Sequence, residues 1–299
     1  MKGYAGLNLI ISMLIFGTIG IFRHYIPFSS AFVAMSRGFI GVLFLAAFLL
    51  VSRKKISLSA IKNNLLLLLL SGAFIGINWM LLFEAYNHTT VATATLCYYM
   101  APVFVMIAST VFLGEKLTLK KSICIIGAII GMVLVSGIIE TGISSASEIS
   151  GMIFGLGAAV FYATVILLNK KMKDISSYDM TIVQLFMAAV IVMPYSLLCE
   201  DIVFSGVPVY SFIMLALIGI LHTGVAYVLY FGSVKNLPSD KVAIYAYIDP
   251  IVAIFLSFII LKEEMSVLSA IGAVLIISLT LINDIDLKKM FEKNKPKKI

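Results

Sequence analysis

The chain has 299 residues, of which 61% are hydrophobic and only 12% are charged, and it carries a formal net charge of +7. Its mean hydropathy is +1.09. Soluble domains are roughly half apolar and a quarter charged, so this composition excludes an ordinary soluble enzyme or binding domain. It predicts a membrane protein whose apolar surface is covered by lipid.

Ten continuous apolar runs predict transmembrane helices, because about 20 such residues cross the hydrocarbon layer and a helix satisfies its own backbone there. Their continuity excludes the alternating pattern of barrel strands. The first run has no signal-peptide cleavage site, so we expect it to be a true span. With ends good to a few residues, the runs are 4–23, 31–52, 64–85, 90–112, 120–138, 150–169, 178–198, 208–231, 240–261 and 267–284.

The positive charges fall on one side of these spans. If both termini share a side, 19 of the 22 Lys and Arg residues lie there, while only Arg23 and Lys262 lie on the other and Arg37 lies within a span. The positive-inside rule then predicts cytoplasmic termini. We expect the basic tail 285–299 to lie near anionic lipid headgroups. The charge needs no nucleic-acid partner to explain it.

One segment occurs twice. Residues 98–119, "YYMAPVFVMIASTVFLGEKLTL", align without a gap with residues 246–267, "AYIDPIVAIFLSFIILKEEMSV". The match predicts two repeats of five spans each, 1–139 and 150–284. An odd number of spans inverts the second repeat in the membrane, and matched loops indeed have opposite charge bias. We therefore expect an all-α membrane protein with ten transmembrane helices in two inverted five-helix repeats, the architecture of many secondary transporters.

These features resemble a known family. Each half has a "P…(L/F)xxE" segment across its fourth span, Glu115 and Glu263 occupy matching positions near its end, and Arg37 lies in "SRGF". Together they are similar to the EamA branch of the drug/metabolite transporter superfamily. The resemblance covers almost the whole chain. It implies a bacterial inner-membrane exporter or facilitator of amino acids, other metabolites or organic cations.

Two prolines occupy matching positions in the repeats. Pro102 and Pro250 are expected in mid-helix, where each would free the carbonyl of the residue four positions earlier. Paired interruptions of this kind indicate a central binding site in transporters. The alternative is that the prolines only bend helices for packing.

Asp249 is the sharpest single signal, and it stands where the first repeat has Ala101. It is nine residues into its run, about 13 Å deep at 1.5 Å per residue. A carboxylate there costs roughly 2.5–3.5 kcal/mol unless it is neutral, paired or hydrated. It could bind a cationic substrate or carry a coupling proton, or it could form a structural ion pair with Arg37.

Aromatic and polar side chains within the spans complete the candidate site. Aromatic faces around an acid suit a cation or an aromatic metabolite, whereas polar side chains are also expected to join helices. A proton-transfer role for His222 and a helix-joining role both stay open. The aromatic candidates are Tyr98, Tyr99, Tyr245, Tyr247, Trp79, Tyr162, Tyr227 and Tyr230, and the polar ones are Asn78, Thr93, Thr95, Gln184, His222 and Thr223.

The remaining features favour structural roles. We expect Glu115 and Glu263 to cap a following helix or pair with lysines, and Glu84 to be an interface charge. The glycine spacings "GAFIG" (72–76) and "GAIIG" (127–131) predict close helix packing within the chain rather than a dimer contact. Cys97, Cys124 and Cys199 have no paired spacing.

The leading interpretation is a secondary transporter of small organic solutes in the plasma membrane, working by alternating access. No "GK" dipeptide occurs, so a Walker A loop is excluded, and we expect no metal, cofactor or catalytic residue. The alternatives are a passive channel or facilitator, and a membrane enzyme acting on a lipid-linked substrate. A monomer and a homodimer remain equally open.

Overall fold

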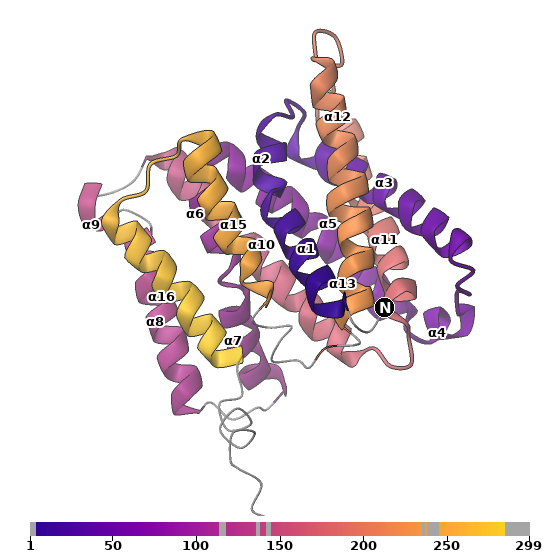
Figure 1. The fold of residues 1–299 in the computed structure, drawn as a ribbon, viewed down its shortest axis with the longest axis horizontal. Helices are drawn as coiled ribbons and strands as arrows, with labels where there is room; N and C mark the ends of the chain where they lie inside the picture. Colours follow the sequence, from indigo (N-terminus) through magenta and orange to yellow (C-terminus); the bar gives the residue numbers. More distant parts are fainter. Residues whose placement is uncertain are drawn as a thin grey trace, which may run out of the picture.

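The computed structural model describes residues 4–113, 118–135, 138–141, 145–234, 237 and 245–284, and these residues form helices and turns with no strand. Figure 1 shows the helices packed as a bundle. Their bounds are α1 Ala5–Gly17, α2 Ile19–His24, α3 Ser30–Val51, α4 Leu58–Asn63, α5 Leu65–His88, α6 Val91–Tyr98, α7 Ala101–Leu113, α8 Leu119–Val135, α9 Ile138–Thr141, α10 Ala146–Lys171, α11 Ser177–Leu198, α12 Val209–Leu217, α13 Ala226–Val234, α15 Ile248–Leu256 and α16 Val267–Asp284, with π-helices η2 Ile218–Val225 and η3 Ser257–Leu261.

The helices coincide with the apolar runs. Seven are long and apolar enough to cross a membrane, and 248–261 and 267–279 are shorter apolar helices. Helix α8 covers the remaining run. Large apolar side chains such as Leu50, Val51 and Leu198 point outward, at 79%, 86% and 84% exposed, which suits contact with lipid. The expectation of an all-α membrane protein is confirmed, while the count of ten spans stays a prediction.

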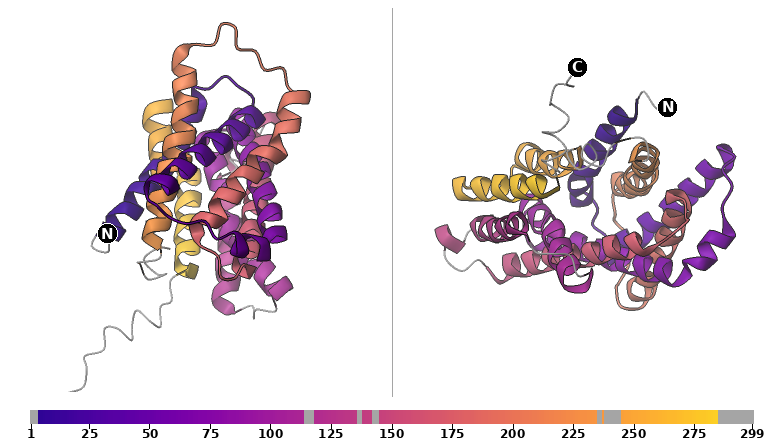
Figure 2. Two further views of the ribbon diagram at one scale, coloured as in Figure 1. Left: turned by 90° about the vertical axis from the view of Figure 1, so that its right-hand side faces the viewer. Right: turned by 90° about the horizontal axis from the view of Figure 1, so that it is seen from below.

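Close helix contacts divide the bundle into a central part and a peripheral pair. Helix α5 packs on α10 and α11, α3 packs on α11 and η2, and α1 packs on α13 and α15. Helices α8 and α16 lie side by side at one edge (Figures 1 and 2). There a Cβ at Gly272 would lie 2.5 Å from the carbonyl oxygen of Gly131. The "GAIIG" spacing therefore serves packing within the chain, as predicted.

The two prolines start helices instead of bending them. Helix α6 ends at Tyr98 and α7 begins at Ala101, so Pro102 is the second residue of α7. Pro250 is likewise the third residue of α15, after a turn at Tyr247. The expected mid-helix position is wrong, because the chain breaks each span before its proline. Proline is tolerated in the first turn, where its missing N–H has no helical partner.

The second half carries two π-helical segments among the described residues. Residues 218–225 lie between α12 and α13 in one continuous helical segment, and residues 257–261 end the helical segment that begins with α15. The counterpart of the first segment, α5, is regular α-helix over all 24 residues. Segments of π-helix are rare and occur mostly at functional sites, so both segments are candidates for parts of a binding site.

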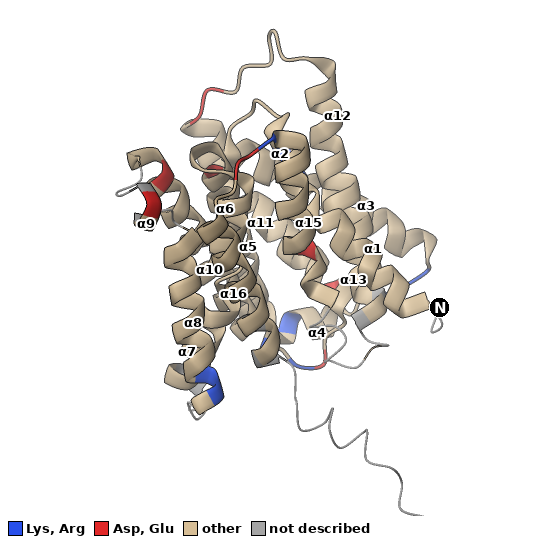
Figure 3. Ribbon diagram, turned by 60° about the vertical axis from the view of Figure 1, so that its left-hand side comes forward, with Lys and Arg blue, Asp and Glu red and all other residues tan. Residues whose placement is uncertain are grey.

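Most charged residues lie toward the ends of the helices (Figure 3). Two that fall within the predicted spans are Arg37, inside α3, and Asp249, in the first turn of α15.

Candidate functional site

Asp249 is held by a hydrogen bond from the other half of the chain. The Tyr99 hydroxyl donates to its Oδ2 at 2.6 Å, across a sequence separation of 150 residues. Tyr99 lies at the C-terminal end of α6, and Asp249 lies in the first turn of α15. Both side chains are half-buried. The bond thus joins the two broken spans at the points where they are broken.

A cluster of tyrosines surrounds this bond. The Tyr98 ring lies 5.9 Å from the Tyr99 ring and 5.4 Å from the Tyr162 ring. The Asp249 carboxylate acts electrostatically on Tyr86, Tyr98 and Tyr162. Tyr162 is 39% exposed, so this side of the cluster reaches the surface of the helix bundle. Aromatic faces beside a carboxylate suit an organic cation or the ammonium group of an amino acid.

Arg37 lies on another side of the same cluster. It is only 3% exposed, and its Nε donates to the Thr223 hydroxyl at 3.0 Å. Its guanidinium stacks over the Trp79 ring at 4.0 Å. The hydroxyls of Tyr98 and Tyr227 act on it electrostatically. Cation–π contacts of a desolvated arginine contribute about 2 kcal/mol, which helps offset the burial of this charge.

The alternative of an ion pair between Arg37 and Asp249 is wrong. No such pair occurs between these two described residues. Arg37 is taken by Thr223 and the Trp79 face, whereas Asp249 is taken by Tyr99. The Tyr98 hydroxyl interacts electrostatically with both charged groups. A positive and a negative group therefore lie near the same tyrosine without pairing with each other.

The π-helix η2 positions the groups around Arg37. Its widened turn lets the Thr223 hydroxyl donate to the Ile218 carbonyl, five residues earlier, at 3.1 Å. The neighbouring His222 is fully buried. One of its ring nitrogens lies 2.8 Å from the Thr18 hydroxyl, and its ring packs on Phe22 at 4.8 Å. Histidine 222 thus connects η2 to the junction of α1 and α2.

Two predicted polar candidates join helices instead. The Gln184 amide donates to Ser71 and to Asn169, both at 2.7 Å. The Asn78 amide donates to the Ala158 carbonyl at 2.6 Å. These bonds tie α5, α10 and α11 together, so the structure places neither side chain in the cluster.

The remaining aromatic candidates divide in the same way. Tyr227 belongs to the cluster through its effect on Arg37, and its ring meets Phe16 edge-on at 5.5 Å. Tyr245 lies near the start of α1, where a Cβ at Gly6 would be 3.7 Å from its ring. Tyr247 is 5% exposed.

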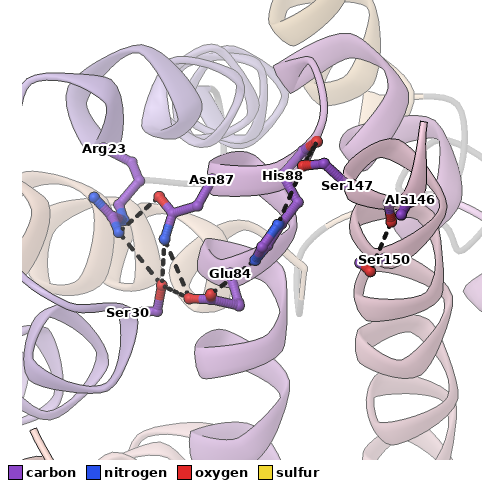
Figure 4. Close-up of polar contacts among 8 residues, drawn as sticks. All are labelled: Arg23, Ser30, Glu84, Asn87, His88, Ala146, Ser147 and Ser150. Atoms are coloured by element: carbon purple, nitrogen blue, oxygen red, sulfur yellow. Dashed lines mark hydrogen bonds and ion pairs between the residues drawn. The ribbon is translucent and has the colours of Figure 1, made fainter.

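A second polar group, which the sequence did not predict, lies where α2, α3 and α5 meet (Figure 4). Arg23, 4% exposed, donates from Nη2 to Ser30 at 3.3 Å and to Asn87 at 3.1 Å. Glu84 accepts from Ser30 at 2.6 Å and from Asn87 at 3.1 Å, and it pairs with His88 at 3.1 Å. The spacing 84, 87, 88 places three polar residues on one helix face. This spacing is the sequence feature from which the polar group could have been predicted.

Glu263 caps a helix, as expected, but not the one that follows it. Its Oε1 accepts from the Val91 N–H at 2.8 Å and its Oε2 from the Ala92 N–H at 3.2 Å. These are the first two residues of α6, which lies 171 to 172 residues earlier in the chain. A carboxylate there also complements the positive end of the helix dipole. Glu115 lies outside the described residues.

Comparisons with known proteins agree on one class. The model of the EamA-like transporter family matches twice, at residues 3–137 and 149–283. The chain is 32% identical to the uncharacterized transporter YxxF of Bacillus subtilis, covering 94% of this chain and 90% of YxxF. It is 27% identical to an uncharacterized transporter of Clostridium kluyveri, covering 77% and 75%. One solved crystal structure covers 98% of this chain and 100% of its own, with a TM-score of 0.67 at 16% identity.

Proposed function

The chain belongs to the EamA-like transporter family, and from this premise we propose that it is a secondary transporter of small organic metabolites. The proposed solutes are amino acids or related organic cations. They would cross the cell membrane by alternating access, as export or exchange, with protons as a possible coupling ion. Tyr99, Asp249, Arg37 and the tyrosines between them would form the central site.

Alternating access requires two halves that move relative to each other around a fixed site. The double match of the family model, once to each half, supports the proposed pair of inverted five-span repeats. The breaks before Pro102 and Pro250 supply the discontinuous helices that line such sites. In this proposal both termini face the cytoplasm, so Arg23 and Glu263 face outside.

The observation that carries the proposal is the hydrogen bond between Tyr99 and Asp249. It joins the two halves at their breaks, yet it consists of one neutral donor and one half-buried carboxylate. A cationic group or a proton would compete with Tyr99 for the same oxygens. Occupancy of Asp249 would therefore change the strength of a contact between the halves, which couples binding to movement.

The test is counterflow in proteoliposomes made with the full chain. The panel would contain small and aromatic amino acids, quaternary amines and sugar phosphates, for wild type, Asp249→Asn and the exposed control Asp201→Asn. We expect saturable counterflow of a zwitterion or cation that is lost in Asp249→Asn and kept in Asp201→Asn. Non-saturable flux would indicate a channel, and a chemically altered solute would indicate an enzyme.

Unchanged counterflow in Asp249→Asn, with unchanged dependence on pH, would remove Asp249 from the site. The tyrosines and Arg37 would then be the groups to replace next.

A further inference from the structure

A separate polar cavity of about 140 Å³ lies at the junction of α2, α5 and α6. Its walls include Gly20, Arg23, Tyr86, Asn87, Val91 and Glu263. We propose that it is a second binding site, for a small zwitterion of the amino-acid type, with the carboxylate on Arg23 and the ammonium on Glu263. The inference deepens the proposed function, because it adds a station for the same class of solute at the predicted outer face.

Arg23 provides a fixed positive group, and three of its five N–H donors are used within the protein. Its Nη1 donates to the Ile26 carbonyl at 2.7 Å, and its Nη2 donates to Ser30 and Asn87. Its Nε is buried and has no hydrogen-bond partner. No described carboxylate forms an ion pair with it. A buried charge without an ion pair is costly, and the carboxylate of a solute in the cavity would pair with the Arg23 charge.

Glu263 provides the negative group across the cavity. Each of its oxygens accepts one backbone N–H of α6, and a carboxylate has about four acceptor positions. It therefore keeps about two positions for an ammonium group while it caps the helix. Arg23 and Glu263 line the same cavity without forming an ion pair. Two opposite charges held apart across a small space match the two ends of a zwitterion.

Size restricts the occupant. A cavity of about 140 Å³ has room for several water molecules, and hence for a solute with a short side chain. On one side the wall is closed where Gly20 packs directly on Val91, because a Cβ at Gly20 would lie 2.4 Å from Val91 Cγ1. Alanine is therefore a better probe than an aromatic amino acid.

Tyr86 connects this cavity to the central site. It lines the cavity, and its hydroxyl lies 3.5 Å from the Thr95 hydroxyl. The same hydroxyl interacts electrostatically with Glu263, Asp249 and Arg37. A solute between Arg23 and Glu263 would thus lie beside a ring that also interacts with the central charges. Both places therefore combine an arginine and a carboxylate near Tyr86: Arg23 and Glu263 in the cavity, and Arg37 and Asp249 in the central cluster.

The first test needs no change in the cavity. Binding of alanine, propionate and ethylamine to the full chain in nanodiscs would be measured by calorimetry, in the Asp249→Asn background to weaken the central site. We expect alanine to bind about tenfold or more tightly than either single-charge analogue, since each lacks one charge-assisted contact. Equal affinity for propionate and alanine, or absence of alanine binding, would overturn the proposed ligand class.

The second test compares neighbouring carboxylates. Glu263→Gln keeps the size and one acceptor oxygen, whereas Glu264→Gln alters an exposed residue next to it. We expect alanine affinity to fall about tenfold in Glu263→Gln and to stay unchanged in Glu264→Gln. Equal affinity in both variants would overturn the role of Glu263.

The two proposals fail separately. If wild type shows counterflow but alanine does not bind in the Asp249→Asn background, the second site is absent and the transporter stands. If alanine binds through Glu263 but no solute shows counterflow, the site stands and the proposed function is wrong.

Discussion

The broken span 91–113 and its sequence counterpart 245–261 are built alike and surrounded differently. Each has a turn just before its proline. Just after that turn, the first span has Ala101, which is 2% exposed within an apolar cluster with Leu96 and Val103. The second has half-buried Asp249, bonded to Tyr99. The two segments thus share the break before the proline, while the acid of the second span stands where the first span has Ala101.

The far end of the second span also returns to the first span. The second span closes with η3 and with Lys262 in the left-handed region, at φ 55°. This turn directs Glu263 back to the start of α6. The second span therefore contacts the first at both ends, through Tyr99 and Asp249 near its start and through Glu263 after its end.

The largest expected effect comes from placing the acid in the wrong half. Ala101→Asp introduces a carboxylate into the apolar cluster, where no partner is arranged for it. We expect a loss of about 3 kcal/mol, the cost of an unpaired charge within a membrane span. Thermal unfolding in detergent, followed by near-UV circular dichroism, would measure it.

Ala101→Ser is the matched control, because a serine can bond the carbonyl of the preceding turn. Its stability should stay within about 1 kcal/mol of wild type. A well-folded Ala101→Asp protein would mean that the first span accommodates the acid as the second does, and the contrast between the halves would fail.

The next effect comes from the contact between the end of the second span and the start of the first. Glu263→Ala removes the acceptor for two N–H groups of α6. We expect a loss of about 1–2 kcal/mol, the usual cost of removing a helix cap. Hydrogen exchange should rise at Val91 and Ala92. In the control Glu264→Ala, an exposed site, exchange there should not change, and equal exchange in both variants would contradict the capping role.

A smaller effect is expected at the contact near the breaks. Tyr99→Phe keeps the ring and removes the donor to Asp249. We expect a loss of about 1 kcal/mol in stability, because the half-buried carboxylate can recruit water in place of the hydroxyl. Counterflow should show a changed KM for cationic solutes. Tyr162→Phe, which keeps the neighbouring ring, is the comparison, and an equal KM in all three proteins would argue against a role for the Tyr99 hydroxyl.

The sequence predicted the helices because lipid imposes a simple rule on composition, and every predicted run has a helix. It also identified Asp249, since a carboxylate in an apolar run is conspicuous. The partner of that carboxylate was not predictable in the same way. Arg37 was the obvious choice by charge, but helix packing places Thr223 and Trp79 around it. Which groups meet depends on helix rotation and depth, and an apolar run specifies neither.

Helix packing also decides two other residues. Gln184 was a candidate for the site or for joining helices, and it joins helices through Ser71 and Asn169. Arg23 was assigned only to the outer side, because it ends an apolar run. It is buried because α2 turns into the bundle and packs against α5, α12 and α15. That turn follows from tertiary contacts that no local pattern records.

The smallest expected effect concerns the prolines themselves. Pro102 and Pro250 lie in the first turns of α7 and α15, where an N–H has no helical acceptor. Pro102→Ala and Pro250→Ala should therefore lower stability by less than about 1 kcal/mol, chiefly through the greater freedom of the unfolded chain. Pro194 lies inside α11, where proline removes a backbone bond, so Pro194→Ala should instead raise the unfolding temperature. If Pro102→Ala or Pro250→Ala stabilised the protein as Pro194→Ala should, the prolines and not the surrounding packing would be what holds the two spans broken.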